Sequence, residues 1–488
     1  MDVLAHLALG FSTALTPANL GYCFIGVCLG MVVGVLPGIG PVTTIALLLP
    51  FTFSLSATSA LIMLAGIYYG SQYGGSTTAI LINLPGEASA TVTCLDGHAM
   101  ARQGRAGQAL AVASVSSFIG GTLGTLAVAA LSGPLAALAS SFEAADYVAL
   151  MAFGLALGVV LAQGAMMKAT AMVLLGLLLG AVGSPTLGGP PRFTFGLTSL
   201  ADGIGFVPLA VGLFGLAEII DALESARAPS VMKTSGHVRL EPGEAKRALL
   251  ASLRGTMLGA ALGVLPGGGP VIASFAAYAV ERKLLSVDAS PRYGAVEGVA
   301  APESANNAAA QTSFIPLLTL GIPSNPVVAL LLGGLVVHGV QPGPEVITKQ
   351  PELFWGLIAS MWIGNAMLLA INLPLVGLWA QLLRVPQRFL LPATVALCCI
   401  GVYGLNHNPF ELVIAAAFGI MGYGLRNLGC EPAPLLLGFI LSQPIEENLQ
   451  RALSFSHGDP TTFLVHPRSA ALLAISIALL VSAAKRRA

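Results

Sequence analysis

Small hydrogen-bonding side chains gather in two stretches of an otherwise apolar sequence, residues 73–87 and 302–326. Both stretches also contain glycine and proline, which interrupt helices. Hydroxyl and amide groups at a helix break can bind ions, although serine and threonine also join membrane helices to one another. Their clustering at breaks favours a ligand-binding site over helix packing. The side chains concerned are Ser76, Thr77, Thr78, Asn306, Asn307, Thr312, Ser313, Ser324 and Asn325.

Two acidic side chains adjoin these stretches, Glu87 and Glu303. An acid inside a membrane segment is a candidate for function, whereas an acid at the solvated end of a segment needs no such role. The sequence leaves both interpretations open for these two residues. Lys168 and Glu218 lie near the ends of apolar segments, where contact with solvent explains them.

Enzyme chemistry finds little support in the sequence. Ser76 has the hydroxyl that an intramembrane hydrolase needs, but no Ser–Lys or Ser–His pairing is evident in its segment. The HExxH pattern, the Walker lysine motif and Cys–His metal patterns are missing too. We therefore expect no catalytic residues, no metal and no cofactor.

The composition indicates a membrane protein. Of the 488 residues, 55% are hydrophobic and 9% are charged, and mean hydropathy is +0.84. A soluble domain carries roughly a quarter charged residues. Residues 3–86 contain no Asp, Glu, Lys or Arg. The formal net charge is zero, which gives no reason to expect a nucleic-acid partner.

A repeated motif divides the chain into halves. GVLPGIGP at 34–41 and GVLPGGGP at 263–270 match at seven of eight positions, 229 residues apart. The loop at 96–108 contains arginines, so the positive-inside rule places it in the cytoplasm. The matching loop at 341–352 has one lysine and two glutamates and can lie outside. The two halves are therefore predicted to have inverted topologies.

We predict an all-α polytopic membrane protein with roughly 10–12 transmembrane helices plus re-entrant or broken helices. The predicted division is a first repeat at 1–223, a cytoplasmic linker at 224–254 and a second repeat at 255–488, with broken helices at 34–44, 70–90, 263–273 and 302–327.

Inverted repeats with broken helices are typical of secondary transporters. Irregular backbone survives in a bilayer only where protein buries it or water reaches it. Helix ends created by a break can hold carboxylates, and freed carbonyl groups can hold cations. A passive anion channel is the alternative, but a channel needs rings of charge or a carbonyl filter. The sequence favours a carrier.

Several unusual motifs resemble the large membrane subunit of the tripartite tricarboxylate transporters. They are GVLPGIGP, YGGSTTAILINLPGE, CLDGHAMARQGRAGQAL, PESANNAA, LTLGIPS and HGVQPGPE, in order along nearly the whole chain. The resemblance implies a multi-pass carrier of the bacterial inner membrane that takes up di- or tricarboxylates. It also implies a small four-span membrane subunit, a periplasmic substrate-binding protein, coupling to sodium or protons, and an elevator-like motion.

The resemblance also implies site residues. Substrate binding would involve Ser76, Thr77, Thr78, Asn83, Pro85, Gly86, Thr312, Ser313, Gly321, Pro323 and Ser324. Family members often have glycine or alanine in place of Thr312 and glycine in place of Ser324, so the substrate can differ from citrate. The glycine-proline turns would frame cation sites, and the candidate cation ligands are Gly38, Gly40, Thr43, Gly267, Gly269, Glu87, Glu303, Asn306 and Asn307.

Charge gives a separate reason to expect cation coupling. The broken regions 34–86, 263–280 and 304–344 contain no Lys or Arg. A helix terminus supplies about half a charge. An anion of two or three charges would be costly to bury on that alone. Cations that bind with the anion would lower this cost.

Overall fold

The computed structural model describes residues 3–36, 40–162, 165–185, 188–224, 240, 242–265, 269–284, 294–372, 374–375 and 387–487. The regular elements in these ranges are helices, apart from one isolated β-bridge between Gly183 and Arg192. This confirms the predicted all-α class.

Five described helices are long and apolar enough to cross a membrane. They are α2 (Pro17–Val35), α6 (Ala106–Ala139), α17 (Pro351–Asn372), α20 (Pro409–Asn427) and α23 (Pro467–Arg487), the last over Pro467–Lys485. Shorter apolar helices accompany them. The chain is therefore a polytopic membrane protein, while the rough count of spans stays a prediction.

The remaining described helices are shorter or more polar. They are α1 (Val3–Ala14), α3 (Pro41–Thr52), α4 (Ala57–Ile82), α5 (Thr93–Arg102), α7 (Ala144–Leu161), α8 (Met166–Gly180), α9 (Phe206–Ala210), α10 (Ala217–Glu224), α11 (Pro242–Val264), α12 (Gly269–Leu284), α13 (Glu297–Thr312), α14 (Phe314–Leu320), α15 (Pro326–Val337), α16 (Glu345–Lys349), α19 (Gln387–Asn406), α21 (Pro432–Phe455) and α22 (Thr462–Val465), with 3₁₀ turns η1 (Ala88–Thr91) and η2 (Thr198–Leu200) and a π-helical segment η3 (Val211–Leu216).

Glycine brings α2 and α4 into backbone contact. Gly26, Gly30 and Gly34 lie on one face of α2, four residues apart. A Cβ atom on Gly30 would lie 2.4 Å from the carbonyl oxygen of Ile67 in α4, and the other two positions are as tight. Small residues at this spacing let membrane helices approach closely.

The second half repeats this contact between α11 and α13. Gly255, Gly259 and Gly263 stand 229 positions after their counterparts in α2. A Cβ atom on Gly259 would lie 2.2 Å from the carbonyl oxygen of Ala305 in α13. The same helix pair is therefore built twice, on the same glycine positions.

The turns that follow these pairs also match. Asn83 ends α4 in the left-handed conformation at φ 58°, and Gly321 ends α14 in the same way at φ 68°. Each is followed by an apolar residue and then proline. α4 is helical through Ile82, so its irregular turn begins later than the start of the predicted broken segment 70–90. The inversion of one half relative to the other stays a prediction.

The predicted linker lies only partly within the described residues. Residues 225–239 and 241 are outside them, and α11 already includes residues 242–254.

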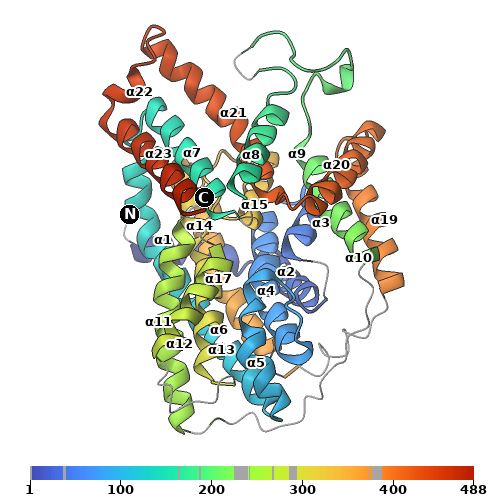
Figure 1. Cartoon of the computed structure of the whole chain (residues 1–488), viewed down its shortest axis with the longest axis vertical. Helices are drawn as coiled ribbons and strands as arrows, with labels where there is room; N and C mark the ends of the chain where they lie inside the picture. Colours follow the sequence, from blue (N-terminus) through green and yellow to red (C-terminus); the bar gives the residue numbers. More distant parts are fainter. Residues whose placement is uncertain are drawn as a thin grey trace.

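The helices pack as two bodies (Figure 1). The first body comprises the helices between residues 3–139 and 242–372, and the second those between 144–224 and 387–487. Within the first body the halves interlock, because α6 packs on α11 and α13 while α17 packs on α2 and α4. The two bodies meet mainly along α3 and α15, which contact the second body's α9, η3, α19 and α21.

Replacing Gly30 by alanine tests the close contact of α2 and α4. The added methyl group meets backbone rather than a movable side chain, so Gly30→Ala is expected to reduce stability by about 1–3 kcal/mol. The matched control is Gly21→Ala on the same helix, where a Cβ has no neighbour within 4 Å. Thermal unfolding in detergent, followed by size-exclusion chromatography, should separate the two variants. Equal midpoints would contradict the contact.

Candidate functional site

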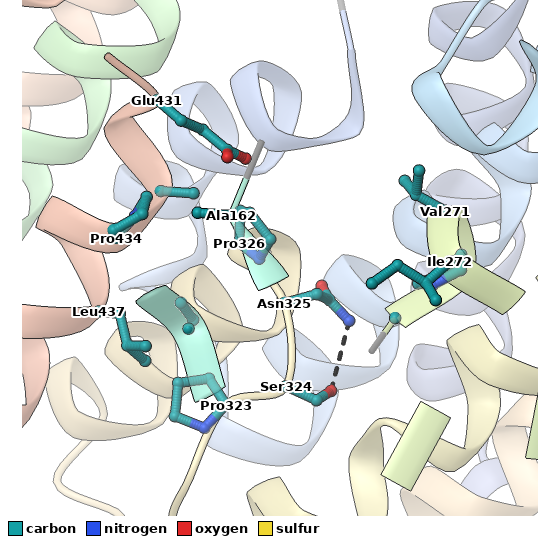
Figure 2. Close-up of a pocket in the computed structure, with 15 residues that line it drawn as sticks. Ala162, Val271, Ile272, Pro323, Ser324, Asn325, Pro326, Glu431, Pro434 and Leu437 are labelled. Carbon is teal, nitrogen blue, oxygen red and sulfur yellow. Dashed lines mark hydrogen bonds between the residues drawn. The ribbon is translucent and has the colours of Figure 1, made fainter. Parts of the chain in front are cut away.

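A cavity of about 160 Å³ lies at the junction of the two bodies. The first body contributes the first turn of α12, the turn at 323–326 and the start of α15. The second body contributes Gly158 and Ala162 at the end of α7, and Glu431, Ala433, Pro434 and Leu437 at the start of α21. Figure 2 shows Glu431, Pro434 and Leu437 across the cavity from Val271 and Ile272.

Three helices begin at this cavity. α12 starts at Gly269, α15 at Pro326 and α21 at Pro432, and first-turn residues of each line the walls. The first N–H groups of a helix lack partners within the helix and carry partial positive charge. Among the described residues, no lysine or arginine lines the cavity. The walls also contain the Glu431 carboxylate, and Pro270, Pro326 and Pro434 have no N–H to donate. An anion bound here would therefore rely on the remaining backbone N–H groups and small polar side chains.

Ser324 and Asn325 supply the polar side chains of the α15 wall. Asn325 is fixed on both sides, because its amide donates to the Tyr68 hydroxyl at 3.1 Å and its oxygen accepts from the backbone N–H of Val328 at 3.1 Å. The Ser324 hydroxyl accepts a weak bond from Asn325 at 3.5 Å (Figure 2) and donates none among the described hydrogen bonds. Ser324 can thus donate to a ligand.

The predicted substrate residues divide between this cavity and the interior of the helices. Pro323 and Ser324 line the cavity, as does Gly269, which was predicted to bind a cation. Gly321 forms the left-handed turn that leads to them. Asn83 and Pro85 are exposed at the matching turn of the first half, and Gly86 packs against the carbonyl oxygen of Gly34.

The other predicted hydroxyls lie inside helices and bond within the protein. Thr77 donates to the Tyr73 carbonyl at 3.2 Å and Thr78 to the Val35 carbonyl at 3.0 Å. Thr312 and Ser313 donate to carbonyl groups of their own helix. These bonds are of the kind that the helix-packing interpretation expects.

The first-half helix that corresponds to α12 holds a carboxylate of the protein itself. The Thr43 hydroxyl donates to Glu218 of α10, and the backbone of Gly40 hydrogen-bonds the same carboxylate. Glu218 therefore caps α3 and joins the two bodies, so its interpretation as a merely solvated residue was wrong. Gly38 and Gly267, also predicted as cation ligands, lie outside the described residues.

Of the predicted acids, Glu303 lies on α13, and Glu87, at the start of η1, contacts Asn306 of the same helix. Glu303 is fully buried, so the solvated-end interpretation fails for it. It accepts hydrogen bonds from Ser76 at 2.5 Å, Ser117 at 3.3 Å and Thr93. Glu87 accepts from Asn306 at 3.4 Å and from a neighbouring serine.

Glu431, Pro434 and Leu437 line the cavity but were not predicted from the sequence as site residues. Only the sequence EPAP at 431–434, with an acid and two prolines beside an apolar run, marked this wall.

Comparisons with known proteins agree with the sequence motifs. A family profile described as "Tripartite tricarboxylate transporter TctA family" matches residues 20–437. A protein of Agrobacterium vitis, "Uncharacterized 52.8 kDa protein in TAR-I ttuC' 3'region", is 54% identical over 485 residues, which cover 99% of this chain and 96% of that protein. A second, "Uncharacterized protein in TAR-II ttuC' 3'region", is 56% identical over 225 residues, 46% of this chain and 93% of that protein. No solved structure matches the chain.

Ser324→Ala tests the cavity as a ligand site. Loss of one hydrogen bond of about 0.5–1.5 kcal/mol predicts that affinity for a bound carboxylate falls about twofold to tenfold. The measurement is equilibrium binding of labelled citrate and succinate to the purified protein. Ser482→Ala, on an exposed face of α23, is the matched control and should bind as wild type. Unchanged affinity in Ser324→Ala would place the ligand elsewhere.

Proposed function

The chain belongs to the tripartite tricarboxylate transporter TctA family, and we propose that it carries di- or tricarboxylates across the bacterial inner membrane by cation-coupled secondary transport. Family membership identifies it as the membrane component of a tricarboxylate transporter. The substrate, the coupling and the delivery by a binding protein are the proposal.

The observation that supports this proposal most strongly is the cavity between the bodies. It is lined by three helix starts, and Ser324 has a hydroxyl free to donate. One carboxylate of the substrate would lie at the start of α12, near Gly269 and Val271. Ser324 would donate to it, and Asn325, held by Tyr68, would keep the turn in place.

The first half supplies a precedent for this binding mode. Glu218 already places a carboxylate at the start of α3, where Thr43 and Gly40 bind it. The equivalent start of α12 opens into the cavity instead. We infer that the start of α12 binds a substrate carboxylate in the way that the start of α3 binds the Glu218 carboxylate.

Transport would proceed by displacement of one body against the other. The bodies share few contacts apart from those of α3 and α15, so a sliding motion would disturb little of either core. The Glu218–Thr43 contact crosses the junction and would have to break during the motion. This is the elevator-like mode that the family resemblance implies.

Cations would offset the charge of the substrate. No basic side chain lines the cavity among the described residues, and a buried di- or tricarboxylate without counter-charge is unfavourable. Candidate cation ligands are the side chains of Glu87, Glu303, Asn306 and Asn307, and the backbone oxygens near Gly40 and Gly269.

The proposed system has two further proteins. A periplasmic binding protein would deliver the carboxylate, and a small four-span membrane subunit would join this chain in the bilayer. Both follow from the tripartite family rather than from a feature of the cavity.

The proposal predicts accumulation that depends on a cation gradient. In proteoliposomes that contain this chain, its small partner and the binding protein, an inward sodium or proton gradient should raise the steady level of labelled carboxylate by about fivefold or more. The control is the same vesicle with the gradient collapsed by an ionophore. Equilibration without accumulation under every gradient would instead indicate a passive channel.

A further inference from the structure

Glu303 is an acid in the middle of the first body that forms no ion pair with a described lysine or arginine. Its side chain is 0% exposed. Two other buried acids of this body do have arginine partners, since Glu281 pairs with Arg254 and Glu297 with Arg247, each at 2.6 Å. No such pair is formed by Glu303 among the described residues.

Three hydroxyl groups from three helices surround the Glu303 carboxyl group. Ser76 comes from α4, Thr93 from α5 and Ser117 from α6. Hydrogen bonds from hydroxyl groups stabilise an ionised carboxylate. The three hydroxyl groups can therefore stabilise the ionised form of Glu303 when a cation or water reaches the site.

Ser76 also allows the neutral form. Its oxygen lies 2.5 Å from Glu303 Oε2 and 2.9 Å from the carbonyl oxygen of Gln72. When Glu303 is ionised, the Ser76 hydroxyl donates to the carboxylate. When Glu303 carries a proton, it donates to the Ser76 oxygen and Ser76 donates to Gln72. Both protonation states are then fully hydrogen-bonded, and neither needs a movement of the backbone.

Glu303 acts electrostatically on Glu87 beside η1, Tyr73 of α4 and Cys94 of α5, and the buried Asp96 of α5 also faces α13, at Gly298. None of them is basic. On α11, which also packs against α13, the arginines are those paired with Glu281 and Glu297. The charge of an ionised Glu303 is therefore left for a proton or a metal cation to neutralise.

The face of α13 beyond Glu303 remains polar. Asn306, Asn307 and Gln311 are at most 1% exposed. The side-chain oxygens of all three have no hydrogen-bond partner among the described residues. Buried groups of this kind need water or a ligand as partner. The same oxygens could bind sodium, so an experiment must separate the two cations.

We propose that Glu303 is the proton-binding group of this carrier, switched between its two states by Ser76. The Ser76 hydroxyl can donate either to the Glu303 carboxylate or to the Gln72 carbonyl. A neutral Glu303 carboxyl group therefore keeps its hydrogen bonds, which favours a proton over sodium. The coupling role rests on the proposed function, but the binding of the proton does not. Protonation forms an O–H bond between a proton from solvent and one carboxylate oxygen of Glu303. Deprotonation breaks this bond and returns the proton to solvent.

Infrared difference spectroscopy on the purified full chain tests proton binding directly. A protonated carboxyl group shows a carbonyl stretch that disappears on ionisation. We expect a pH-dependent band in wild type, its loss in Glu303→Gln, and its retention in the matched control Glu87→Gln. Ser76→Ala should keep the band but move its pH midpoint, because one of the two states loses a partner.

Transport provides a second, separate readout. In proteoliposomes, Glu303→Gln should reduce proton-driven accumulation by about fivefold or more, whereas Glu345→Gln, which changes an exposed acid of α16, should accumulate carboxylate as wild type does. A band that persists in Glu303→Gln would overturn the proposal, and so would a carboxylate signal that responds to sodium at fixed pH but not to pH. If the band behaves as expected but no system accumulates carboxylate, the proposed function fails and the proton site stands.

Discussion

Close backbone contact through glycine is the constraint on which the rest of the structure depends. α2 meets α4, and α11 meets α13, at distances that leave no room for a Cβ atom. Because each pair is held so closely, the irregular turns that follow it are fixed in place, at Asn83 in one half and Gly321 in the other. Both α4 and α13 carry buried hydroxyl and amide groups. Hydroxyls such as Thr77 and Thr312 bond to carbonyls of their own helix, whereas the side-chain oxygens of Asn306, Asn307 and Gln311 have no partner among the described residues. Packing and polar chemistry therefore use the same helices.

The two halves use their equivalent helix starts differently. The start of α3 is closed by the Glu218 carboxylate from the second body, whereas the start of α12 opens into a cavity between the bodies. This difference would suit the proposed two-state carrier, since one helix start is held against the other body while its equivalent is open. Glu431 is the one charged side chain among the described residues that line the cavity. In the proposed mechanism, affinity for a carboxylate would come from helix starts and Ser324, and cations would neutralise its charge. Glu303, in the packed interior rather than in the cavity, can bind a proton without competing for the substrate's place.

Much of this was open to prediction, because membrane segments, glycine spacing and the repeated GVLPG motif are local patterns. Ser324, Gly269, Glu87, Glu303 and Asn306 were named as candidates from such patterns, and Pro323 from the family resemblance. Their binding roles stay predictions. The opposite wall of the cavity was not, because α21 is far from α12 in the sequence and its lining side chains are mostly apolar. For Ser76, Thr77 and Thr78, the sequence could not show which groups their hydroxyls bind. Their density indicated a ligand site, but a hydroxyl group on a helix can bond to a backbone carbonyl or a neighbouring acid, and the sequence does not show which partner is in reach.

The account depends most on relative motion of the two bodies when a carboxylate binds between them. Electron paramagnetic resonance distances between spin labels at Arg102, in the first body, and Leu428, in the second, measure this directly. Both residues are exposed, and a pair at Arg102 and Lys349 within the first body is the control. The account predicts that citrate or another transported carboxylate, added with its cation, shifts the distance between the bodies and leaves the control distance unchanged. Transport with a fixed distance between the bodies would contradict it.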